Sequence, residues 1–198
     1  MDTAMAGRHI VPMSTTPRVR SRRADAIRNE SLVRAAAERV FTRKGQAILM
    51  EDVAAEAGVS KGTVYNVFAS RDGMVEILTV AALKVAAADY RAAAGAADLW
   101  GALTAAILTP TLGLSASAQL MDPAAPRTPA RLALEEAMAA LNALLDTAKA
   151  AGVVRPEIQV GHLTTLFCGL YGVLPNYDAR APGEALAYAD IILRGIRT

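Results

Sequence analysis

Residues 53–68 constrain the fold more than any other part of the chain, because they have the pattern of two short helices joined by a tight turn. Gly58 suits the turn, since glycine alone adopts a positive φ without a clash at Cβ. Ser60 can cap the second helix by accepting a hydrogen bond from an unpaired backbone N–H. Val64 and Phe68 can close over the first helix, which leaves the polar residues of the second helix facing outward. The pattern predicts a helix-turn-helix, a unit whose second helix lies in the DNA major groove.

With the residues on either side, this stretch resembles the DNA-binding segment of the tetracycline-repressor (TetR) family. That segment begins with a helix ending in an aromatic residue and a glycine, which correspond to Phe41 and Gly45. The order and spacing of the family pattern are kept from about residue 28 to residue 78. The matching blocks are Asp52-Val53-Ala54, Ala57-Gly58-Val59-Ser60, Gly62-Thr63-Val64-Tyr65, Phe68 and Ser70-Arg71.

The resemblance implies that the second helix of the unit enters the major groove. Lys61 would contact phosphate as a flexible point charge, and Gly62 would let the helix approach closely. Thr63 would touch a base edge, and Tyr65 would offer its phenol to phosphate unless it is partly buried between helices. The residues expected to bind DNA are Ser60, Lys61, Gly62, Thr63, Tyr65, Asn66 and Arg71.

Two positions depart from the family pattern. Leu49 stands where Ser or Thr usually caps the first helix of the unit, and leucine cannot accept the N–H. That helix start should be weaker unless Glu51 or Asp52 compensates through its charge. Asn66 stands where His or Arg is frequent. Asparagine can pair with adenine or bond a phosphate, so we expect DNA binding with an altered base preference.

Composition and charge agree with an all-α protein in two functional parts. Aromatic residues make up 5% of the chain and strand-type alternation is hard to find, so we expect about nine helices in all. Residues 1–71 carry 12 Lys and Arg against 7 Asp and Glu, a net charge of +5, whereas residues 72–198 carry 9 against 12, a net charge of −3. The basic part suits phosphate contact, and the acidic part suits a separate task.

These observations predict three segments. Residues 1–24 form a disordered basic arm, which is either a solubilising tail or a minor-groove contact, and Met13 is a possible true start. Residues 25–71 form the DNA-binding domain, with its first helix over residues 26–44. Residues 72–198 form a ligand-binding and dimerisation domain.

The last two helices, expected at about 160–174 and 182–197, are apolar over a wide arc and must therefore pack on two sides. In the resembled family, the corresponding helices build a four-helix bundle with their copies in a second subunit. The alternative is the core of a monomer. The residues expected at a dimer interface are Leu163, Phe167, Leu170, Leu186, Tyr188 and Ile191.

The carboxyl-terminal part also predicts a small-molecule pocket, because Pro and Gly breaks between its helices leave room for a cavity. Few charged residues lie nearby, which favours an apolar effector. For each candidate wall residue, ordinary core packing is the alternative. The candidates are Trp100, Leu103, Ile107, Met121, Met138, Phe167 and Tyr171.

The sequence offers no converging nucleophile, base or metal ligands, so we expect no catalytic residue, no metal and no cofactor. Its single cysteine, Cys168, has no partner for a disulfide. No apolar run is long enough for a membrane span and no signal peptide is evident, so we expect a cytoplasmic protein. The expected function is a ligand-responsive regulator, most readily a repressor that binds a palindromic operator as a dimer. The alternatives are a DNA-binding regulator without an effector and a helical small-molecule enzyme.

Overall fold

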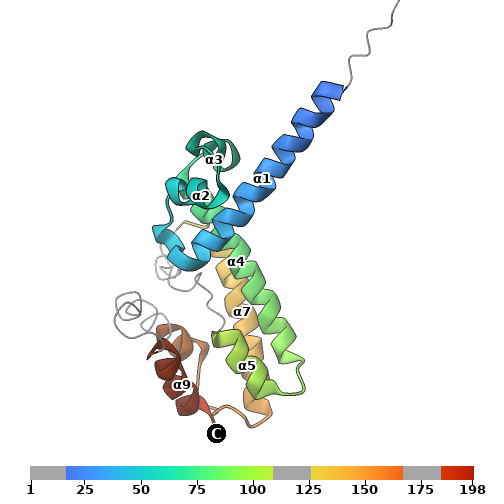
Figure 1. The fold of residues 1–198 in the computed structure, drawn as a ribbon. Coiled ribbons are helices and arrows are strands. Elements are labelled where there is room, and N and C mark those ends of the chain that lie inside the picture. The colour runs from blue at the N-terminus through green and yellow to red at the C-terminus, as the bar shows by residue number, and fades with distance from the viewer. Residues whose placement is uncertain (1–16, 109–125, 167–183) are drawn as a thin grey trace, which may run out of the picture.

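The computed structural model describes residues 17–108, 126–166 and 184–198 (Figure 1). Within these ranges the regular structure is helical apart from one isolated β-bridge between Val154 and Arg197, which confirms the all-α prediction. Residues 160–166 are also helical. The helices with described bounds are α1 (Pro17–Lys44), the short 3₁₀ helix η1 (Gly45–Ala47), α2 (Met50–Ala57), α3 (Lys61–Phe68), α4 (Arg71–Ala94), α5 (Leu99–Leu108), α7 (Pro129–Ala150) and α9 (Glu184–Ile196).

The first helix is longer than the sequence predicted. It begins at Pro17, so residues 17–24, which we expected to be disordered, are helical. Proline is favourable in the first turn of a helix because its missing N–H would have no partner there. Figure 1 shows these first turns of α1 extending beyond the other helices. The end of the helix is as expected: α1 stops at Lys44, and Gly45 has a φ of 55°.

Buried apolar side chains form two separate clusters. The amino-terminal core joins α1, α2 and α3 to the first turns of α4, where Met74 and Leu78 are buried. The carboxyl-terminal core joins the rest of α4 to α5, α7 and α9, and it includes Leu83 and Tyr90. Since α4 enters both cores, it connects them directly, and the amino-terminal core continues past residue 71 into this helix.

Side-chain caps fix where three of the helices begin. Ser70 accepts a hydrogen bond from the Gly73 N–H at 3.0 Å and opens α4. Asp98 accepts one from the Gly101 N–H at 2.9 Å and opens α5. Thr128 caps α7, with Pro129 at its first position. Each cap satisfies a backbone donor that would otherwise have no partner inside its helix.

Helices α5 and α7 pack against α4, and Figure 1 shows α7 running beside it. An ion pair between Arg91 and Glu136, at 2.6 Å, joins the two helices at the surface. The end of the chain is held by the bridge at Arg197 and by the Arg155 N–H, which donates to the Ile196 carbonyl at 3.0 Å. Among the described helices, none combines the length and apolar character that crossing a membrane requires.

Candidate nucleic-acid interface

The start of α2 is stabilised by an acid in its first turn. Leu49 offers no side-chain cap, as expected, but the Asp52 carboxylate accepts a hydrogen bond from the Leu49 N–H at 3.0 Å. The same carboxylate accepts one from Lys44 Nζ at 2.6 Å. These two hydrogen bonds hold the pKa of Asp52 below its ordinary value, and the one from Lys44 has the larger effect. The compensation anticipated for the missing cap is therefore present, and it also ties α1 to α2.

The turn between α2 and α3 has the geometry that the sequence predicted. Gly58 ends α2 with a φ of 65°, and a Cβ built there would meet no atom within 4 Å, so backbone conformation rather than space requires glycine. The Val59 N–H closes the turn on the Ala54 carbonyl at 3.0 Å. Ser60 then caps α3 by accepting a hydrogen bond from the Thr63 N–H at 3.3 Å.

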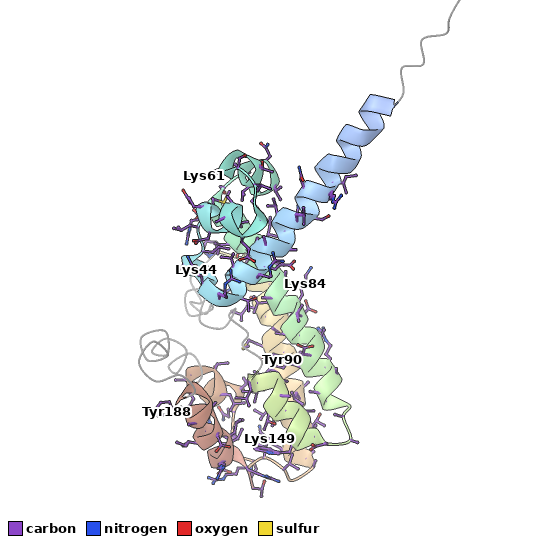
Figure 2. All side chains as sticks on the ribbon, viewed as in Figure 1. Lys44, Lys61, Lys84, Tyr90, Lys149 and Tyr188 are labelled. Carbon is purple, nitrogen blue, oxygen red and sulfur yellow. The ribbon has the colours of Figure 1, made fainter. Side chains whose placement is uncertain are left out.

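The third helix has one buried and one exposed face. Val64 and Phe68 are buried in the amino-terminal core. The opposite face exposes Lys61, Gly62, Tyr65 and Asn66, with Thr63 partly exposed beside them. Tyr65 is 42% exposed, so its phenol is available to a partner and burial between helices does not apply. Figure 2 shows Lys61 at this end of the molecule, far from Tyr188 at the other.

Lys61 is paired within the protein, which the sequence did not predict. Its ammonium group donates to the carboxylate of Glu51 at the start of α2, and it lies 5.7 Å from the centre of the Tyr65 ring. The hydrogen bond lowers the pKa of Glu51 and raises that of Lys61. Glu51 thus occupies the place that a phosphate oxygen would take on this cation. The ten-residue separation of the pair follows from the turn geometry and matches no sequence motif.

Gly62 is not required by packing inside the protein. A Cβ built on it would touch only Ser60 Oγ, at an ordinary contact distance of 3.8 Å. The helix would therefore accept alanine, which is the better helix former. The packing of the fold itself therefore gives no reason for glycine at this position.

Arg71 has a structural role inside the fold, and its expected contact with DNA stays a prediction. Its Nε donates to the Ile48 carbonyl at 3.0 Å, and one terminal nitrogen donates to the Gln46 carbonyl. The other terminal nitrogen pairs with Asp72 at 3.3 Å. All three guanidinium nitrogens are engaged, so this side chain holds the loop before α2 against the start of α4.

A second ion-pair group fixes α2 on α1. The Glu56 carboxylate pairs with Arg39 at 2.8 Å and with Arg43 at 2.6 Å. These two hydrogen bonds lower the pKa of Glu56, and the one from Arg39 has the larger effect. Part of the basic excess of the amino-terminal half is therefore paired with acids of the same fold.

The predicted effector residues belong mainly to the carboxyl-terminal core. Leu103 and Ile107 are buried in it, and Met138 packs against it. The Arg197 guanidinium lies 4.9 Å from the centre of the Trp100 ring and covers one face of it. The structure therefore places Leu103 and Ile107 in the packed core, which is the alternative that the sequence left open. Met121, Phe167 and Tyr171 lie outside the described residues.

The predicted dimer residues fall into two groups. Leu163 is only 2% exposed and lies in the carboxyl-terminal core, which corrects its assignment to an interface. Ile191 is 65% exposed, and Tyr188 on the same helix, labelled in Figure 2, is also exposed. Leu166, on the preceding helical segment, adds a further exposed apolar side chain. Phe167, Leu170 and the side chain of Leu186 lie outside the described residues.

Comparisons with known proteins agree with this geometry. Residues 33–78 match the family described as bacterial regulatory proteins, tetR family. Residues 101–198 match the carboxyl-terminal domain described as transcriptional regulator SbtR-like. A search of curated proteins gives no match.

Two solved structures illustrate the similarity in fold. One is a TetR transcriptional regulator from Streptomyces coelicolor, with 25% identity and a TM-score of 0.60 over 85% of this chain and 98% of that one. The other is a TetR regulatory protein from Mycobacterium vanbaalenii, with 24% identity and a TM-score of 0.54 over 89% of this chain and 99% of that one.

Proposed function

The chain belongs to the TetR family of DNA-binding transcriptional regulators rather than to a class of enzymes, and from this we propose that it is a dimeric repressor released from its operator by a small molecule. The observation that carries the proposal is the exposed polar face of α3, held by a capped turn over a packed core. Operator binding takes place where the bacterial chromosome lies, so we propose a cytoplasmic location.

Each exposed residue of α3 has a proposed contact. Lys61 exchanges its Glu51 partner for a phosphate, and Tyr65 donates its phenol to the DNA backbone. Gly62 allows the backbone of the helix to approach closely. Thr63 and Asn66 face base edges, where asparagine can bond adenine in two places. Ser60 acts through its cap, which sets the direction of the helix.

A second copy of the chain completes the site. One recognition helix contacts too few bases for specificity, so two helices must read two half-sites of a palindrome. The exposed apolar side chains Leu166, Tyr188 and Ile191 lie on the last helices and provide an apolar surface for such a pairing. Tyr188 and Ile191 are three residues apart on α9 and so lie on one face of it, and exposed apolar faces of this kind are typical of protein–protein interfaces.

Control would pass through α4, which enters both cores. We propose residues 25–71 with the first turns of α4 as the DNA-binding domain, and the remaining residues as the ligand-binding and dimerisation domain. An effector that fits one spacing of the two recognition helices better than another shifts the equilibrium by its difference in affinity. Trp100 and Met138, both partly buried at the edge of the carboxyl-terminal core, are the described candidates for contact with an effector.

The test is a competition experiment with the purified protein. A labelled DNA fragment from upstream of its own gene is bound and then displaced by unlabelled copies of the same fragment or of a shuffled sequence. The proposal predicts that the shuffled DNA competes at least about a thousandfold less well, as is typical of specific regulators. Equal competition by both DNAs would show non-specific binding only and would refute an operator-binding function.

A further inference from the structure

A hollow of about 300 Å³ lies where the end of α1 meets the middle of α4 and α5. Phe41 from α1 and Leu78 and Val85 from α4 give it hydrocarbon walls. Val85 is 60% exposed, so this apolar surface is in contact with water. The volume is at the lower end of the range found for small-molecule sites. A second hollow between α4 and α5 adjoins it, since Asp89 and Ala106 line both.

The polar groups of the first hollow can only accept hydrogen bonds. They are the carboxylates of Glu38 and Asp89 and the hydroxyl of Thr42. Thr42 already donates its proton to the Glu38 carbonyl at 2.9 Å, which leaves it an acceptor towards any ligand. Among the described residues, no ion pair neutralises either carboxylate, and the nearby Arg91 is engaged by Glu136 at 2.6 Å.

We propose that this hollow binds a small lipophilic cation, an ammonium ion that carries a hydrocarbon group. The hydrocarbon would remove water from the walls formed by Phe41 and Val85, which is favourable in proportion to the apolar area covered. The positive group would meet Glu38 and Asp89. A neutral ligand would cover these carboxylates without compensating their lost hydration, and an anion would be repelled.

The position of the hollow gives such a ligand a route to DNA binding. Its walls come from α1, which supports the helix-turn-helix, and from α4, which continues into the carboxyl-terminal core. A cation in contact with both helices favours the arrangement that fits it. If the bound cation changes the affinity of the protein for DNA by some factor, bound DNA must change the affinity for the cation by the same factor. This coupling rests on the proposed function, whereas binding of the cation does not.

Calorimetric titration of the full chain with hexylammonium tests the proposal, with hexanol and hexanoate as matched probes that carry no charge or the opposite charge. We expect the cation to bind more tightly than either of the others, and to bind less tightly as salt is added. Glu38→Gln and Asp89→Asn keep the shape of each side chain and should each reduce the affinity for the cation about fivefold. Glu157→Gln, an exposed carboxylate elsewhere, should leave it unchanged.

A steric variant provides an independent check. Ala81 lines the hollow and is exposed, so Ala81→Leu should fill the space and abolish binding of the cation without disturbing a core. Should Ala81→Leu fail to fold, the two carboxylate variants decide the question. Equal binding of hexanoate, or wild-type affinity for the cation in both carboxylate variants, would overturn the site. Cation binding without any change in the affinity for upstream DNA would overturn the coupling, and absence of specific DNA binding would overturn the proposed function alone.

Discussion

Replacing Gly62 with alanine should stabilise the protein and weaken DNA binding at the same time. The added methyl group meets only Ser60 Oγ at 3.8 Å, so the folded state has room for it. Alanine exceeds glycine in helix propensity by about 0.8–1 kcal/mol. For a chain of this size, about 1 kcal/mol raises Tm by about 2–4 °C. Thermal melting followed by circular dichroism measures the shift.

At the DNA surface the same methyl group would stand between α3 and the nucleic acid backbone. Inserting a methyl group into a close-packed contact costs about 1–3 kcal/mol, which corresponds to a loss of affinity of about fivefold to more than a hundredfold. Fluorescence anisotropy with a labelled upstream DNA fragment measures this loss of affinity.

Gly161→Ala is the matched control for Gly62→Ala. Gly161 is also the second residue of a helical segment, and a Cβ built there would meet no atom within 4 Å. This control should raise Tm and leave DNA affinity unchanged. Wild-type DNA affinity in Gly62→Ala would refute the close approach of α3, and a lower Tm would refute the conclusion that the fold has room.

Three further predictions follow from particular contacts. Arg71→Ala removes the donors to the Ile48 and Gln46 carbonyls and should lower the free energy of unfolding by about 1–3 kcal/mol in urea titrations, whereas an Arg71 that acted only on phosphate would leave it unchanged. The lowered pKa values of Asp52 and Glu56 mean that the folded state binds protons less readily than the unfolded state. Their stabilisation is therefore complete above their ordinary pKa of about 4 and is lost as the pH falls through the lower folded values. Urea midpoints measured down this range should fall more steeply for the wild type than for Asp52→Asn. Ile191→Asp would bury a charge in the proposed dimer interface at a cost of several kcal/mol, so light scattering should show a wild-type dimer and a monomeric or aggregated variant; a wild-type monomer at micromolar concentration would contradict the interface.

Local sequence rules predicted the helix-turn-helix closely. The turn between α2 and α3 lies where the pattern of residues 53–68 predicted it, because Gly58 and Ser60 act through backbone conformation and a cap within three residues of themselves. The starts of α4, α5 and α7 were predictable for the same reason. Short-range interactions of this kind depend little on the rest of the fold.

Contacts between elements could not be predicted in the same way. Arg71 reaches carbonyls 23 and 25 residues away, and Lys61 pairs with an acid on another helix. Ala69 has a φ of 58°, a conformation that favours glycine, so the turn between α3 and α4 departs from what its residue type indicates. Such features follow from how the packed helices place the backbone.

Apolar periodicity also left the partner of a buried face undetermined. It identified Leu163 and Leu103 as apolar positions, and both lie in the carboxyl-terminal core of a single chain. A helix pattern shows which face avoids water but not what covers that face. The acceptor-lined hollow beside α1 was missed because its residues come from three helices with no common sequence signal.

The salt dependence of DNA binding tests most directly whether the exposed face of α3 contacts DNA. Dissociation constants for the upstream fragment are measured over a range of salt concentrations for the wild type, Lys61→Ala and Lys84→Ala. Lys84 is an exposed cation on α4, away from α3 in Figure 2, and serves as the control. We expect Lys61→Ala to reduce the slope of log affinity against log salt by about one per subunit, and hence by about two per dimer. The Lys84→Ala slope should equal that of the wild type, and an unchanged slope in Lys61→Ala would show that Lys61 on α3 does not contact the DNA backbone.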